Sequence, residues 1–366
     1  MILTSLLSSR SNIIKIALLN DTHCGIRNSS DIFIEYQERF YNEVFFPYLN
    51  DNGITQILHL GDYYENRRFI NFKALNSNRK VFLERLRSDG ITMDIIPGNH
   101  DTYYKNTNDL NSLKELLGHY MNEVNIVQDC SVLDYDGMKV GLVPWICPEN
   151  EQECMDFLVN CKADVIGGHF ELNGFDMLRG VPCTHGMSAE NLHRFELVLS
   201  GHYHVKSNQE NIHYLGSQME FFWNDAHDDK FFHILDTDTR ELLPVQNPLT
   251  LFQRVYYDDT KNDYSEYDTA RFDKQFVKVV VIKKADSFTF DRFLDRIQQR
   301  DTYDLKIQED FSEFEGTNVA DDGLEVEDTS SLLSAYVDNV ETVLNKERIK
   351  SEVLDLMTEA QSQDVV

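Results

Sequence analysis

The sequence lacks long apolar runs and closely paired cysteines. No run of about 18 apolar residues is present, which excludes a transmembrane helix from sequence. The six cysteines form no Cys-x-x-Cys pair, the spacing typical of thiolate metal and redox sites. The first twelve residues have neither a basic start nor a sustained apolar stretch, so we expect a disordered leader and not a signal peptide. We therefore expect a cytoplasmic protein with free thiols.

Basic charge is also scarce, with 34 Lys and Arg against 62 Asp and Glu and a formal net charge of −28. That balance opposes non-specific attraction to nucleic acid over most of the surface. The exception is the segment from Arg67 to Arg87, which holds seven basic residues and one acid. This segment is either a solvated helix face or a contact for a phosphate backbone, with Arg67, Arg68 and Lys73 as the candidates for DNA.

Five short segments end in residues that bind hard or borderline metals, and most of them follow an apolar run of strand composition. The segments are Asp21-Thr22-His23, Gly61-Asp62, Gly98-Asn99-His100-Asp101, Gly167-Gly168-His169 and Gly201-His202-Tyr203-His204. In an α/β sheet, side chains from distant parts of the sequence meet at the carboxyl ends of the strands. One such segment would mean little, but five in this order predict a metal site.

The predicted donors are carboxylates, imidazoles and one amide oxygen, a set that suits Mn²⁺, Fe²⁺ or Zn²⁺. Seven donors exceed the needs of one ion but fit two ions about 3.5–4 Å apart that share a carboxylate and clamp a phosphate. Asp62 stands alone in its segment and is the natural bridge. His100 would then lie beside the scissile phosphate, with Asp101 fixing its tautomer. The predicted ligands are Asp21, His23, Asp62, Asn99, His169, His202 and His204.

Strand and helix patterns alternate in the first half of the chain and give way to hairpins later, which predicts a two-sheet α/β sandwich. We expect Ile212–Leu215 and Lys230–Asp236 to pair with each other and close the sheet. An α/β domain that carries the predicted metal site is expected at 13–245, and a small α+β capping domain at 246–308. An acidic linker would span 309–328.

Residues 329–366 show apolar side chains at helical spacing, which predicts two amphipathic helices. They either fold back on the body or dock on a partner protein, and the acidic linker favours the partner. The candidate contacts are Leu333, Tyr336, Val337, Val340, Leu354 and Met357.

The five segments together resemble the signature of calcineurin-like metallophosphoesterases. Within that superfamily, Asp21-Thr22-His23-Cys24-Gly25 and the Asp101 that follows His100 are similar to motifs of the SbcD/Mre-eleven group of DNA repair nucleases. Gly168-His169-Phe170-Glu171 and Pro144-Trp145 resemble the shorter, phage-encoded recombination endonuclease subunits. The resemblance implies a four-layer sandwich, two mixed sheets flanked by helices, with a capping domain and a helical tail. For a phage-encoded protein the compartment would be the host cytoplasm.

The resemblance also implies roles. Asp21, His23, Asp62 and His204 would hold one metal ion, and Asp62, Asn99, His169 and His202 the other, most often Mn²⁺. His100 would stabilise the transition state or protonate the leaving 3′ oxygen. The implied activity is a 3′→5′ exonuclease on duplex DNA and an endonuclease on single strands. The implied assembly is a homodimer within a heterotetramer with an ABC-type ATPase of the SbcC/Rad-fifty type.

One departure from the family pattern is visible. Cellular members usually carry His three residues after the aspartate of Gly61-Asp62, where this chain has Glu65. Because that histidine is linked to exonuclease positioning, the balance of exonuclease to endonuclease activity is open. Two other classes also remain open: a small-molecule phosphodiesterase or phosphoprotein phosphatase with the same metal cradle, and a non-catalytic scaffold.

Overall fold

The computed structural model of the chain describes residues 14–309, 337, 345–346 and 348–351. Contacts within it divide the chain into two units. The first runs to Glu220 and includes Asp228–Leu249, and the second comprises Phe221–His227 and the chain from Thr250 onward. Among the helices of the described part, none is both long and apolar enough to cross a membrane.

The first unit contains two six-stranded mixed sheets. The first sheet has the order β14-β13-β1-β2-β3-β4, in which β1 to β4 are parallel to one another, β13 is antiparallel to β1, and β14 is antiparallel to β13. Its strands are β1 (Lys15–Leu19), β2 (Gln56–His59), β3 (Thr92–Ile95), β4 (Val124–Ile126), β13 (Lys230–Asp236) and β14 (Leu242–Asn247).

The second sheet has the order β11-β12-β10-β7-β6-β5, and its central strands β12, β10, β7 and β6 are parallel. Its strands are β5 (Ser131–Tyr135), β6 (Met138–Val143), β7 (Val165–Gly168), β10 (Leu197–Ser200), β11 (Ser207–Gln209) and β12 (Ile212–Tyr214). A separate two-stranded hairpin, β8 (Asp176–Leu178) and β9 (Val181–Pro182), lies between β7 and β10 in sequence.

Apolar side chains from both sheets form one buried core between them. Ile16 and Leu18 of β1 and Leu58 of β2 join Leu142 of β6 and Leu199 of β10 in this core. The central strands are therefore buried on both faces, which is why they are almost uninterrupted apolar runs.

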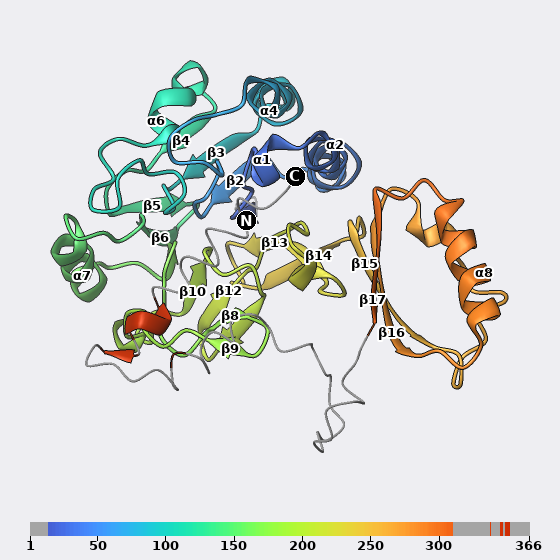
Figure 1. Cartoon of the computed structure of the whole chain (residues 1–366). Coiled ribbons are helices and arrows are strands. Elements are labelled where there is room, and N and C mark those ends of the chain that lie inside the picture. The colour runs from blue at the N-terminus through green and yellow to red at the C-terminus, as the bar shows by residue number, and fades with distance from the viewer. Residues whose placement is uncertain (1–13, 310–336, 338–344, 347, 352–366) are drawn as a thin grey trace, which may run out of the picture. The chain divides into compact units, whose positions relative to one another are not determined.

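Helices cover the outer faces of the two sheets and complete the four layers (Figure 1). On the first sheet, Phe40 and Phe45 contact Phe232 of β13, with ring centroids 6.2 and 5.1 Å apart. On the second sheet, Cys154 and Leu158 of α7 share a core with Ile166. The expected two-sheet sandwich flanked by helices is confirmed. The helices are α1 (Ile26–Ser29), α2 (Asp31–Arg39), α3 (Phe46–Asn52), α4 (Phe72–Asn78), α5 (Glu84–Asp89), α6 (Ser112–Leu116) and α7 (Glu151–Asn160), with π-helical turns at η1 (Phe40–Phe45) and η2 (Arg79–Leu83).

The expected pairing of Ile212–Leu215 with Lys230–Asp236 is wrong. β12 lies in the second sheet beside β10 and β11, whereas β13 lies in the first sheet between β1 and β14. The segment between them crosses from one sheet to the other. The apolar pattern predicted both strands but could not reveal which sheet each would join, because both sheets have central strands that are buried and apolar.

The second unit is built on a three-stranded parallel sheet of β15 (Phe252–Asp258), β16 (Phe276–Lys283) and β17 (Asp304–Glu309). Helix α8 (Ser287–Gln298) connects β16 to β17 and packs Phe293 and Ile297 against Val277 and Val279. The predicted domain limits at 245 and 308 stay predictions. The expected acidic linker and almost all of the expected tail lie outside the described residues.

Gly61, in the segment after β2, packs closely against His169 and Gly98. Its φ of +90° is a left-handed conformation, and a Cβ there would lie 2.6 Å from Nδ1 of His169 and 2.8 Å from Cα of Gly98. Gly53 is also left-handed, with φ +63°, but a Cβ there would meet nothing within 4 Å.

We predict that Gly61→Ala lowers the free energy of unfolding by about 2–5 kcal/mol, because steric overlap adds to backbone strain. Gly53→Ala bears the strain alone and should cost about 1–2 kcal/mol. Urea unfolding of both variants checks this, and equal losses in the two would contradict the argument.

Candidate metal centre

The five predicted segments come together at one edge of the sandwich. Leu19, His59 and Ile95, the last residues of β1, β2 and β3, lie in register across the first sheet, and Gly168 and Ser200 end β7 and β10 in register in the second. Each segment therefore leaves its sheet at the same level. Leu60 links the two sheets there, since its carbonyl oxygen lies 2.8 Å from Nδ1 of His169.

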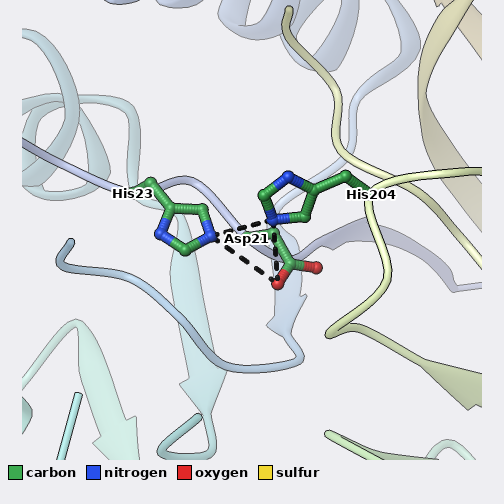
Figure 2. A group of neighbouring side chains, drawn as sticks. All are labelled: Asp21, His23 and His204. Atoms are coloured by element: carbon green, nitrogen blue, oxygen red, sulfur yellow. Dashed lines mark hydrogen bonds and ion pairs between the residues drawn. The ribbon is translucent and has the colours of Figure 1, made fainter. Parts of the chain in front are cut away.

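One group of donors consists of Asp21, His23 and His204 (Figure 2). The two Nε2 atoms are 3.1 Å apart, and each lies 3.9 Å from Oδ1 of Asp21. Asp21 and His23 are buried, while the side chain of His204 is 21 % exposed. The backbone N–H of His202 donates to Asp21 Oδ2 over 3.0 Å, which ties the segment after β10 to the segment after β1.

A second group consists of Asp62, His169 and His202, with Asn99 between the imidazoles. Asn99 Oδ1 lies 2.9 Å from Nε2 of His169 and 3.0 Å from Nδ1 of His202. Because Nδ1 of His169 faces the Leu60 carbonyl, its Nε2 is directed toward Asn99 and Asp62.

Asp62 lies between the two groups. Its Oδ2 is 3.3 Å from Nε2 of His169 and 3.8 Å from Nε2 of His23. Its Oδ1 accepts the backbone N–H of His100 over 2.7 Å. One carboxylate thus faces donors of both groups, as a bridging ligand would.

Several of these residues have a left-handed backbone, which is uncommon outside glycine. The φ angles are +47° at Asp21, +44° at His23, +56° at Asp62 and +88° at His202. Conformations of this kind cost about 1–3 kcal/mol each and cluster at functional sites. The sharp turns aim the side chains of consecutive strand ends at a common point.

His100 is partly exposed, with 30 % of its side chain accessible. Its Nδ1 is 2.8 Å from the backbone oxygen of Glu65, and this bond fixes the tautomer with Nε2 free. The structure corrects the prediction that Asp101 fixes this tautomer, because the partner of Nδ1 is the Glu65 carbonyl. The Asp101 carboxylate is fully buried and accepts the backbone N–H groups of Tyr64 over 3.0 Å and Gly98 over 2.9 Å.

Asp101 therefore acts on His100 through the backbone, by holding the segment after β2 against the segment after β3. Burial and the neighbouring Asp62 raise the pKa of Asp101 to about 6, although the backbone donors act in the opposite direction.

Two residues near the donors had no predicted role. Glu65 Oε2 lies 2.6 Å from Nδ1 of His23, so its carboxylate orients that imidazole. The Trp145 ring packs 5.3 Å from the ring of His202 and 6.0 Å from that of His169. Glu65 lies three residues after Asp62, and Trp145 belongs to the Pro144-Trp145 dipeptide. Neither contact has a sequence signal, because each joins segments far apart in the chain.

The charges of the cluster divide its histidines into two kinds. Burial lowers the pKa of His23, but Glu65, Asp62 and Asp21 outweigh it and raise that pKa to about 9. His169 likewise has its pKa raised to about 9, because Asp62 outweighs burial. Burial and His169 lower the pKa of His202 to about 3, and burial and His23 hold the pKa of His204 well below its ordinary value. Two imidazolium groups thus offset the buried carboxylates.

The three residues predicted to contact DNA lie at the start of the basic segment. Arg67 is half-buried, whereas Arg68 and Lys73 are exposed, and Lys73 pairs with Asp31. Within the described residues, no ion pair joins Arg67 or Arg68 to an acid.

The rest of the basic segment is partly neutralised. Arg85 pairs with Asp89 over 2.8 Å and Arg87 with Glu123 over 2.9 Å. Of the predicted tail contacts, Val337 is described, and it is buried. Leu333, Tyr336, Val340, Leu354 and Met357 lie outside the described residues.

The donor set fits divalent ions. Imidazole nitrogens and carboxylate oxygens converge within 4.8 Å in each of two groups, with a carboxylate between them, and Mn²⁺, Fe²⁺ and Zn²⁺ prefer such mixed ligands. Two ions held in this way are the device of many phosphoester hydrolases.

The chain belongs to the calcineurin-like phosphoesterase family, whose model matches residues 14–206, and it is therefore a phosphoester hydrolase. It is 30% identical to exonuclease subunit 1 of Enterobacteria phage T4, over 91% of this chain and 95% of that protein. The resemblance inferred from the motifs is thus confirmed. A structure described as a novel archaeal phosphodiesterase is also similar, with 16% identity over 64% of this chain and 100% of that one, at a TM-score of 0.32.

We predict that metal binding releases protons from His23 and His169. Ligation needs neutral imidazole, and both pKa values are about 9 in the metal-free protein. Affinity should therefore weaken as pH falls below about 9, by up to about two logarithmic units per pH unit, and should level off above it.

Calorimetric titration with Mn²⁺ near neutral pH, in two buffers with different heats of ionisation, counts the protons released. Identical heats in the two buffers would show that no proton leaves.

Proposed function

We propose that this chain is the nuclease subunit of a recombination or repair complex, a 3′→5′ exonuclease on duplex DNA and an endonuclease on single strands. The observation that carries the proposal is the pair of donor groups that share Asp62, with the partly exposed His100 beside them. The similarity to a phage exonuclease subunit over nearly the whole chain favours DNA as the substrate.

In this proposal, Asp21, His23, Asp62 and His204 hold one Mn²⁺ ion, and Asp62, Asn99, His169 and His202 hold a second. When bound, the ions activate a water molecule and neutralise charge on the phosphate. Asp62 fixes the spacing of the two half-sites, and Glu65 orients His23 through Nδ1.

His100 contacts the substrate in this scheme. Its Nδ1–H donates to the Glu65 carbonyl, so His100 can donate from Nε2 to the leaving 3′ oxygen only as the imidazolium, which carries a proton on both nitrogens. Asp101 is a positioning residue, because it contacts the backbone on either side of the site and not the imidazole.

Glu65 also bears on the balance of activities. Its side chain is engaged with His23, and its backbone holds His100. Because this position carries a carboxylate paired with His23 and not the histidine of cellular members, we propose that the balance of exonuclease to endonuclease activity differs from that of those enzymes.

The acidic character of the chain suggests that it does not bind DNA alone with high affinity. We assign much of the binding surface to an ABC-type ATPase of the SbcC/Rad-fifty type, docked on the tail helices, with a homodimer at the centre of the heterotetramer. The phage relative is named as a subunit, which supports an assembly of this kind. The reaction would take place in the cytoplasm, that of the host for a phage-encoded protein.

We predict that His100→Ala lowers nucleotide release about 10²–10⁴-fold while bound manganese is unchanged, because His100 is not a proposed ligand. The assay uses 3′-labelled duplex with Mn²⁺, with and without the candidate ATPase, and metal content is measured on the same samples. His119→Ala is the matched control, since His119 is exposed and is not among the donor residues.

Unchanged release by His100→Ala would overturn the assigned role. If the wild type hydrolyses a small phosphodiester but does not cleave DNA, the result would favour the alternative, a small-molecule phosphodiesterase or a phosphoprotein phosphatase.

We predict that the double variant Arg67→Ala, Arg68→Ala binds DNA more weakly than the wild type. The slope of the logarithm of the binding constant against the logarithm of salt concentration should fall by the amount that about two phosphate contacts contribute. Arg85→Ala with Arg87→Ala removes the same charge, but those arginines are paired with Asp89 and Glu123 and should matter less. Binding measured across a salt series separates the pairs. Equal slopes for both would remove Arg67 and Arg68 from the DNA contact.

A further inference from the structure

A further group of metal-type donors in the same unit shares no residue with the donors described above. It consists of the Glu171 carboxylate, the Cys183 thiol and the His185 imidazole, whose ligand atoms all lie within 4.8 Å of one another. Nε2 of His185 is 3.0 Å from Oε1 of Glu171. The group combines O, S and N donors, and it is the one such group in the described residues that contains a thiol.

The backbone holds these three residues in place. Glu171 O accepts the N–H of Met187 over 2.8 Å, and Cys183 N–H donates to Phe175 O over 2.8 Å. Gly186 packs so closely against this segment that a Cβ there would lie 2.5 Å from the backbone oxygen of Glu171. The donors are therefore preorganised by a continuous set of backbone bonds, a requirement for a metal site whose ligands come from a loop.

The turn that carries Cys183 and His185 also suits a thiolate. The N–H of Gly186 donates to Sγ of Cys183 over 3.3 Å. A backbone donor of this kind offsets part of the negative charge of a thiolate sulfur. Cys183 is 1 % exposed and packs among Leu172, Phe175 and Tyr203, so an uncompensated thiolate there would be costly.

The three side chains differ in solvent exposure. Cys183 is the buried anchor, whereas the side chains of His185 and Glu171 are 30 % and 34 % exposed. Bond lengths of about 2.0–2.3 Å place tetrahedral zinc ligands roughly 3.3–3.7 Å apart, which small side-chain shifts would reach here. A water molecule could take the fourth position from the open side.

We infer that Glu171, Cys183 and His185 form a third metal site, selective for Zn²⁺ because a thiolate, an imidazole and a carboxylate are zinc ligands. The bound ion fastens the loop after β9 to the segment that follows His169. This inference does not depend on the proposed nuclease activity. The competing explanation is a hydrogen-bonded ion pair of His185 with Glu171 beside an inert buried thiol.

The test is a titration of the metal-free full chain with Co²⁺, followed by absorption spectroscopy. Thiolate bound to Co²⁺ gives a charge-transfer band in the near ultraviolet, and no other donor group of the described residues contains sulfur. The wild type should show the band, addition of Zn²⁺ should abolish it, and Cys183→Ser should lack it. Cys161→Ser, the matched control, should keep it.

His185→Gln covers the case in which Cys183→Ser does not fold, because His185 is at the surface. After dialysis against Zn²⁺, His185→Gln should hold one zinc ion fewer per chain than the wild type. A wild type without the thiolate band, a band that survives Cys183→Ser, or equal zinc content in His185→Gln would each overturn the inference.

Discussion

The structure depends on one electrostatic constraint, which is that carboxylates and imidazoles from five strand ends must share a buried space. Asp62 is at the centre of this constraint, since its two oxygens face His169, His23 and the backbone of His100. Two histidines with raised pKa values compensate the carboxylates in the protein without metal. The two sheets, in turn, are placed so that their parallel strands end at the same level, which is what lets these groups meet.

The sequence was a good guide wherever the signal was local. Ligand residues after apolar runs predicted where the chain leaves each sheet, and the structure gathers all seven of them. Sheet membership was not predictable, as β12 and β13 illustrate. Both are apolar strands, and the choice of partner is made by packing between distant segments and not by the composition of either strand.

The same limit explains why the contacts of Asp101 and Glu65 could not be predicted from the sequence. A carboxylate next to a histidine in sequence suggested a histidine–carboxylate pair, but consecutive side chains in a turn point in different directions. Asp101 points into the backbone of the segment after β2, and the partner of His100 comes from that segment instead. The motifs predicted residues that the structure brings together, whereas the contacts between them required the fold.

The left-handed residues at the strand ends have a wider consequence. Asp21, His23, Asp62 and His202 hold their conformations because the packed sheets leave them no alternative. The geometry that collects the ligands is thus maintained by the rest of the domain against a local preference to relax. Substitutions that loosen the core far from this edge would let these turns rearrange first, so the catalytic end of the molecule is its most sensitive reporter of general weakening.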